Sequence, residues 1–211
     1  MLDVQSDEDV RKIKIAKVGI NKVLYPITFE ENNGLEIKHC STVGEFAFFV
    51  ELPAEKKGTH MSRFLSVLYD FSPFFSFEKF NLLSQTINER LESHTCYFNV
   101  KFKYFFDMYA PVTKTKGTAH ADVKLSLKNK NNTISKKLSI KVPVKTLCPC
   151  SKAISENGAH SQRSVVHLKI WDPQHSMKDY IQICELSSSA PLYPILKRED
   201  EKFITEKAYH T

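Results

Sequence analysis

The stretch TLCPCSKAISENGAHSQRS, residues 146–164, places two cysteines and a histidine close together in the chain. Cys148 and Cys150 flank a single proline, a loop too tight for an unstrained disulfide between them. A thiol, an imidazole and a nearby carboxylate suit zinc or another borderline divalent ion that keeps one position open for water. Spacing alone leaves the commoner alternative open, which is two packed cysteines and a surface histidine. The paired C-x-x-C or H-x-x-x-H groups of a structural zinc finger are absent from this stretch, as is the C-x-x-C of a disulfide-exchange motif.

Composition narrows the class of protein. The chain has 211 residues, of which 42% are hydrophobic, so it can bury one large core or two small ones. It contains no apolar run near the roughly 18 residues that span a bilayer, and its acidic start at residues 1–9 is unlike a signal peptide. We therefore expect a cytoplasmic protein with no membrane partner.

The net charge of +6 favours an anionic ligand, whether nucleotide, nucleic acid or acidic lipid. Lysines between residues 124 and 145 alternate with apolar residues, which is typical of the solvated face of a sheet. This stretch lacks the interleaved aromatic residues on which nucleic-acid bases stack. We therefore expect no nucleic-acid partner.

The elements that must position the motif follow from hydrophobic periodicity. Alternation of period two predicts strands over residues 43–52, 97–106 and 121–128. Helical spacing predicts two helices between the first and second of these strands, separated by the Phe-Ser-Pro sequence at residues 71–73. Their apolar faces are Met61, Phe64, Leu65 and Leu68 in the first helix and Phe80, Leu83, Ile87 and Leu91 in the second.

A similar order begins again after the polar turn at residues 129–132. Strands are predicted over residues 134–144 and 166–170, followed by helical spacing from Met177 to Glu185 and again after Pro194. The cysteine stretch then lies on the connection between these two strands. The prediction is an α+β protein with a first module over residues 13–130 and a second, incomplete module over residues 131–211. We expect Val166, Leu168 and Ile170 to form an inward face that is only partly covered.

Four blocks of sequence carry a resemblance to a known family. They resemble the signature blocks of GTP cyclohydrolase type IB, in the same order and at similar separations over nearly the whole chain. The blocks are KVGINKVLYPI (17–27), KGTHMSRF (57–64), LCPCSKAISENGAHSQRS (147–164) and LKREDEKFITEKAY (196–209). The resemblance implies the tunnelling fold, with antiparallel sheets and paired helices in two tandem modules. It also implies a barrel-like homo-oligomer, expected to be a tetramer, with active sites at subunit interfaces.

The resemblance further implies an activity and a metal site. The family hydrolyses GTP to 7,8-dihydroneopterin triphosphate and formate, the first step of tetrahydrofolate biosynthesis. Cys148, His160 and Glu201 resemble the ligands of one divalent ion, which can be zinc, iron or manganese, and Cys148 and His160 are the expected catalytic residues. Such an ion lowers the pKa of bound water towards neutrality. Cys150 is then a packed neighbour.

Basic residues near these blocks are candidates for holding the triphosphate of GTP. His60 is expected at the start of a helix with Thr59 as its cap. Arg63 has an equally weighted alternative, which is an ion pair with a surface carboxylate. The candidate substrate-binding residues are Lys57, His60, Arg63, Lys152 and Arg163.

The chain departs from the family pattern at its end. Family members continue past the position of Thr211 into a segment that includes the acidic residue that binds the guanine edge. Residues 1–211 alone are therefore expected to hydrolyse GTP very slowly, because guanine is not positioned. Two alternatives are a non-catalytic metal- or nucleotide-binding remnant of the fold and the related nitrile reductase of queuosine synthesis. The reductase uses its thiol as a covalent nucleophile, whereas the C-P-C and G-A-H blocks favour a ligand role.

Overall fold

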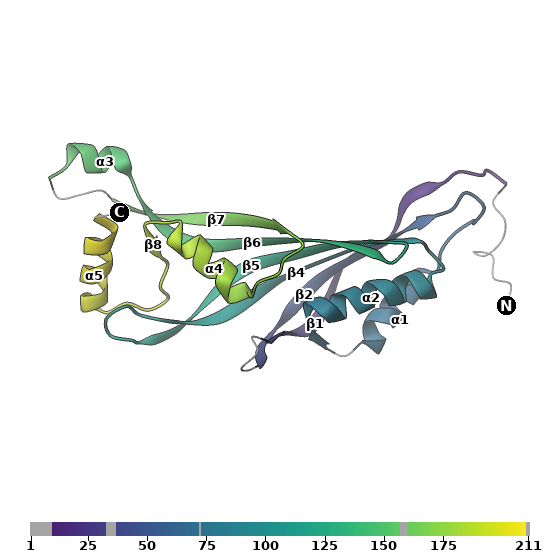
Figure 1. Ribbon diagram of the computed structural model, residues 1–211, viewed down its shortest axis with the longest axis horizontal. Coiled ribbons are helices and arrows are strands. Elements are labelled where there is room, and N and C mark those ends of the chain that lie inside the picture. The colour runs from purple at the N-terminus through teal and green to yellow at the C-terminus, as the bar shows by residue number, and fades with distance from the viewer. Residues whose placement is uncertain (1–9, 33–36, 72, 157–159, 210–211) are drawn as a thin grey trace. The chain divides into compact units, whose positions relative to one another are not determined.

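The computed structural model describes residues 10–32, 37–71, 73–156 and 160–209 (Figure 1). Over these residues the protein is a mixed α and β structure with five helices and a large, mostly antiparallel sheet. The strands are β1 (Ile15–Asn32), β2 (Ile37–Leu52), β3 (Phe74–Phe75), β4 (Thr95–Tyr109), β5 (Lys116–Lys130), β6 (Thr133–Leu147), β7 (Ser161–Trp171) and β8 (Ala190–Pro191). The helices are α1 (Met61–Asp70), α2 (Phe77–Arg90), α3 (Pro149–Ile154), α4 (Met177–Leu186) and α5 (Arg198–Tyr209).

The sheet has the strand order β3-β1-β2-β4-β5-β6-β7, and β8 pairs with β6. β1 pairs antiparallel with β2, and β2 pairs antiparallel with β4. The strands predicted from alternation are all present, and each is longer than predicted. The pairing of β1 with β2 shifts register between Ile20 and Val23, and a side chain on nearby Gly19 would collide with the carbonyl oxygen of Phe48. Glycine is therefore required where these two backbones approach most closely.

Contacts divide the chain into two compact units. The first unit comprises residues 1–102, 124–138 and 170–173, and the second comprises residues 103–123, 139–169 and 174–211. This division falls partway along the long strands β4 to β7. The predicted modules, residues 13–130 and 131–211, instead follow the order of the chain. They stay a prediction.

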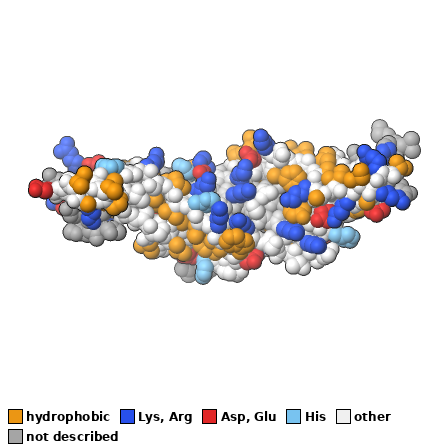
Figure 2. All heavy atoms as spheres, turned by 90° about the horizontal axis from the view of Figure 1, so that it is seen from above, with side chains coloured by type: hydrophobic (Ala, Val, Ile, Leu, Met, Phe, Trp, Pro, Cys, Tyr) orange, Lys and Arg blue, Asp and Glu red, His pale blue; other side chains and the backbone are white. Residues whose placement is uncertain are grey.

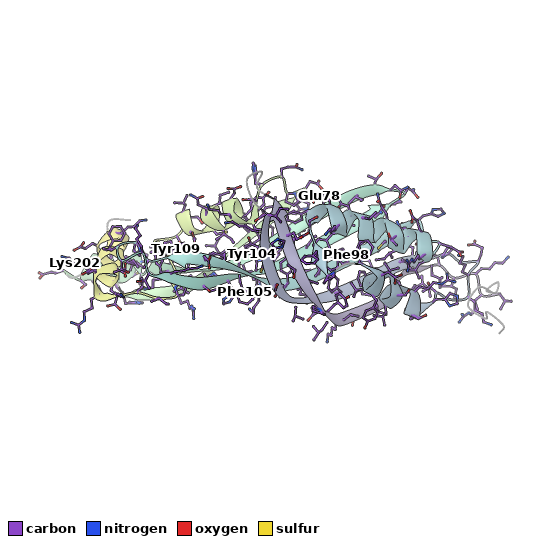
Figure 3. All side chains as sticks on the ribbon, turned by 90° about the horizontal axis from the view of Figure 1, so that it is seen from below. Glu78, Phe98, Tyr104, Phe105, Tyr109 and Lys202 are labelled. Carbon is purple, nitrogen blue, oxygen red and sulfur yellow. The ribbon has the colours of Figure 1, made fainter. Side chains whose placement is uncertain are left out.

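The core of the first unit is a cluster of phenylalanines between the sheet and helices α1 and α2. The ring of Phe98 on β4 lies 5.3 Å from that of Phe48 and 5.4 Å from that of Phe80. All three side chains are fully buried, whereas Phe105, farther along β4, is 44% exposed (Figure 3). The period-two pattern therefore correctly predicted which face of β4 is buried.

The helix faces predicted for this unit are confirmed with one difference. Phe64 and Leu68 of α1 are buried, as are all four predicted residues of α2 and the turn that follows it. Met61 is 39% exposed because it is the first residue of α1, where a side chain has no preceding turn to cover it. Leu65 is half-buried.

The second unit is organised around α4. Ser176 and Asp179 form a reciprocal capping box at its start, and its buried face includes Tyr180 and Cys184. On β7, Val166 and Leu168 are half-buried, as expected for an incompletely covered face.

No helix in the described part of the chain is long and apolar enough to cross a membrane.

The interpretation of a solvated face is confirmed for the lysines of β5, whereas Lys136, Lys137 and Lys145 of β6 are half-buried. Lys124, Lys128 and Lys130 are exposed and alternate with the buried residues Leu125 and Leu127. Figure 2 shows basic side chains on the surface with acidic and hydrophobic ones among them. This mixture is typical of a solvated surface.

Candidate metal and substrate site

A short helix carries the cysteine motif. β6 ends at Leu147, Cys148 is the N-cap residue, and α3 begins at Pro149. Proline is favoured at the first helical position because its fixed φ suits a helix and its missing N–H would have no intrahelical partner there. The sequence pattern predicted only a connection here, although Pro149 was a signal that could have revealed the helix start.

The connection between β6 and β7 brings the backbones of Cys148 and His160 together, one at its start and the other at its end. The backbone N–H of Cys148 donates a hydrogen bond to the carbonyl oxygen of His160, with an N···O distance of 3.4 Å. On the same two strands, the hydroxyls of Thr146 and Ser164 are 2.8 Å apart. Two of the three predicted metal ligands are therefore held next to each other by backbone pairing between the end of β6 and the start of β7.

The two cysteines of the motif have different surroundings. Cys148 is half-buried, whereas Cys150 is exposed, so the prediction that Cys150 is a packed neighbour is wrong. Hydrogen bonding from the hydroxyl and the backbone N–H of Ser151 holds the pKa of the Cys148 thiol below its ordinary value. The thiolate is the form that binds metal ions, so these surroundings favour Cys148 as a ligand.

The third predicted ligand, Glu201, lies in the first turn of α5. Its carboxylate is exposed, and its backbone N–H donates to the carbonyl oxygen of Lys197 at 2.9 Å. The neighbouring Asp200 is fully buried. Burial by itself would raise the pKa of Asp200, but hydrogen bonds from Thr113, Lys197 and Val112 outweigh it and hold the pKa below its usual range. Nothing in the sequence LKREDEKF distinguishes Asp200 from its acidic neighbours, so its role could not be predicted.

The residue types of the predicted set suit a borderline divalent ion: thiolate, imidazole and carboxylate. Their arrangement is only partly assembled. Within the described ranges, no group of three or more His, Cys, Asp or Glu residues lies close enough to hold a metal ion. The structure thus brings Cys148 and His160 together and does not add Glu201 to them, and the three-ligand set stays a prediction.

The block at residues 57–64 forms part of a pocket in the first unit. His60 and Arg63 line this pocket together with Lys56 and Glu92. The prediction that Thr59 caps α1 is wrong, because His60 itself is the N-cap residue and its side chain makes no capping hydrogen bond.

Arg63 has protein partners. It donates from Nη1 to the carbonyl oxygen of Arg90 at 3.1 Å, and the same nitrogen lies 4.0 Å from Oε1 of Glu92. The alternative of an ion pair with a surface carboxylate is therefore realised. Glu92 also accepts from Lys56 Nζ at 2.8 Å.

The remaining basic candidates are exposed and occupy different elements. Lys57 precedes α1 in the first unit, Lys152 lies on α3, and Arg163 lies on β7. Lys152 and Arg163 belong to the same unit as Cys148 and follow it in the sequence. Positive charge close to Cys148 and His160 in the chain favours an anion there.

Comparison with known proteins decides the family. A family model described as type I GTP cyclohydrolase folE2 matches residues 1–211. The chain is 38% identical over 210 residues to the GTP cyclohydrolase FolE2 of Citrifermentans bemidjiense, covering 98% of this chain and 76% of that protein. It is 39% identical over 212 residues to the FolE2 of Geotalea uraniireducens, covering 99% and 76% of the two chains. The FolE2 of Neisseria meningitidis serogroup C is 38% identical over 208 residues, which cover 98% of this chain and 68% of that one. The chain belongs to the type I GTP cyclohydrolase FolE2 family.

The four blocks that carried the resemblance occupy separate places in this FolE2 family fold. They lie on β1, on the approach to and start of α1, on the β6–α3–β7 excursion, and on the segment that leads into α5 and most of that helix. All three predicted metal ligands fall in the last two blocks, and both of these belong to the second unit. The family resemblance drawn from the sequence is confirmed.

Proposed function

We propose that this chain catalyses the GTP cyclohydrolase I reaction, in which GTP is hydrolysed to 7,8-dihydroneopterin triphosphate and formate. The observation that carries the proposal is the match of the FolE2 family model to residues 1–211. The net charge of +6 is favourable for a triphosphate substrate.

The proposed metal ligands are Cys148, His160 and Glu201. A bound divalent ion would supply Lewis acidity and activate water for attack on the guanine ring. Cys148 contributes a thiolate, which its hydrogen bonding with Ser151 favours. The backbone hydrogen bond between Cys148 and His160 limits how far their side chains can separate, and His160 contributes one ring nitrogen.

The proposed triphosphate contacts are the basic residues of two blocks. Lys152 lies between Cys148 and His160 in the sequence, Arg163 follows them, and both supply positive charge to this block. Lys57, His60 and Arg63 supply a second group in the first unit. Arg63 is engaged with Glu92, so a phosphate must compete with that carboxylate for the guanidinium.

The proposed assembly is a homo-oligomer, a tetramer. Each chain contributes two tandem tunnelling-fold modules. The proposed location is the cytoplasm. Light scattering coupled to size-exclusion chromatography measures the mass of the assembly directly. A monomer at micromolar concentration would contradict the assembly.

The reaction is tested by supplying the metal-free chain with manganese, iron or zinc and GTP, then measuring formate and the fluorescent pterin. We expect both products in equal amounts only when metal is present, and a much lower rate for His160→Ala. Saturable GTP binding with neither product under any of the three metals would show a nucleotide-binding protein and refute the catalytic proposal.

A further inference from the structure

The first turn of α5 is fastened to the turn between β4 and β5 by one buried side chain. Oδ1 of Asp200 accepts hydrogen bonds from the backbone N–H groups of Val112 and Thr113, both at 2.9 Å. Oδ2 accepts from the hydroxyl of Thr113 at 2.7 Å and from the backbone N–H of Lys197 at 3.0 Å. Four donors thus converge on one carboxylate, which is fully buried. Figure 3 shows the two elements near each other, with Lys202 on α5 and Tyr109 at the end of β4.

Two features make this attachment stiff. The bond from Lys197 N–H is the same bond that an acidic residue makes in a capping box, so Asp200 caps α5 while it reaches out of the helix. The turn that receives it is itself closed, because Ala110 N–H donates to the carbonyl oxygen of Thr115 at 3.0 Å. Bonds to a charged acceptor are also stronger than bonds between neutral groups.

The attachment fixes the rotation of α5 about its own axis. Asp200 and Ile204 are one turn apart, and both are buried. Glu201 follows Asp200 and is rotated about 100° from it, so its carboxylate leaves the anchored face and is exposed. The direction of Glu201 is therefore determined by the bonds of Asp200.

We propose that Asp200 is a positioning residue for Glu201, a role that rests on the proposed function in which Glu201 is a metal ligand. None of the described side chains of α3 is buried, whereas α5 is anchored at its first turn by Asp200. Asp200 therefore fixes the direction of Glu201 on α5, while the pairing of β6 with β7 holds Cys148 next to His160.

The test measures Co²⁺ binding to the full chain, using the affinity and the visible absorption band of Co²⁺, which reports the number and type of ligands. Asp200→Asn keeps the shape but replaces one acceptor oxygen with a donor. Glu201→Gln removes the ligand. Glu199→Gln is the matched control, because it makes the same charge change at an exposed position of the same helical turn.

We expect Glu201→Gln to weaken Co²⁺ binding by more than about ten-fold and Asp200→Asn by about ten-fold, with the same change in the absorption band. Glu199→Gln should change the affinity by less than about two-fold. Wild-type affinity and spectrum for Asp200→Asn, beside a weakened Glu201→Gln, would overturn the positioning role and leave the proposed function standing. Unchanged binding by Glu201→Gln would overturn the ligand assignment and the positioning role together.

A second pair of variants decides the question if Asp200→Asn does not fold. Thr113→Ala removes one of the four donors, and Thr113→Ser keeps the hydroxyl. Weakened Co²⁺ binding in the alanine variant with recovery in the serine variant supports the proposal. Equal, wild-type binding by both variants overturns it.

Discussion

Glu185 on α4 gives a prediction about the pH dependence of stability. Its side chain is half-buried, and its Oε1 is buried without a hydrogen-bond partner in the described part of the chain. Burial raises the pKa of this carboxyl above its ordinary value. A buried polar group left without a partner costs about 1–3 kcal/mol. Glu185→Gln removes the charge at nearly constant volume, so it should raise the free energy of unfolding at about pH 8 by about 1 kcal/mol.

The sign of the pH dependence follows from proton binding. The pKa of Glu185 is higher in the folded protein than its ordinary value of about 4.3 in the unfolded chain. At pH values between these two pKa values, the folded protein therefore binds more protons than the unfolded chain. The contribution of Glu185 to stability therefore falls as the pH rises through that window. The glutamine variant should lose this contribution to the pH dependence.

Urea unfolding of the wild type, Glu185→Gln and the exposed control Glu199→Gln at about pH 5 and about pH 8 measures this difference. A second measurement uses Tyr193, whose pKa is raised by burial and by the charges of Glu185 and Asp200. Ultraviolet titration of the phenol should show a lower pKa in the Glu185→Gln variant. The reasoning fails if Glu185→Gln and Glu199→Gln have the same stability at both pH values.

Three further predictions concern the metal site and the core. Metal analysis of the purified proteins should show a larger loss of bound metal from Cys148→Ala than from Cys150→Ala. Cys148 is half-buried and its thiol has a lowered pKa, whereas Cys150 is exposed. Equal losses would contradict the assignment of Cys148 as the ligand. His160→Ala should weaken metal binding about ten-fold or more, and an unchanged affinity would make it a bystander. Phe98→Ala should lower the free energy of unfolding by about 3–5 kcal/mol, since its ring is fully buried among other phenylalanine rings. Phe105→Ala on the exposed face of the same strand should cost less than about 1 kcal/mol in the same urea titration, and similar losses from both would contradict the assigned faces.

The strands and long helices could be predicted because each depends on a local pattern. Phe98, Val100 and Phe102 alternate with polar residues and are buried on one face of β4. The short helix α3 has too few residues for a periodic pattern and no buried side chain, so hydrophobic spacing could not reveal it. Its only local signal was Pro149 at the first helical position.

The candidate site also contains one part that a local pattern could predict and one part that it could not. Cys148 and His160 are joined by the return of the chain from α3, so their nearness in sequence correctly indicated their nearness in space. Asp200 accepts a hydrogen bond from Thr113, which is 87 positions away in the sequence. No periodicity or spacing rule links such distant residues, since their contact depends on how β5, β6 and β7 return the chain.

Asp200 and Glu185 together show why burial alone does not determine the state of a carboxylate. Both belong to the second unit, and burial disfavours the charge of each. Asp200 is the more buried of the two, yet four converging hydrogen-bond donors lower its pKa. It therefore remains an anion through neutral pH. Its contribution to stability is lost only in acid, as the pH falls below the ordinary carboxyl pKa of about 4. Glu185 has an oxygen without a donor, and its pKa is raised instead. The number of donors that meet each carboxylate therefore decides the difference: Asp200 stabilises the second unit in its charged form, whereas ionised Glu185 destabilises it.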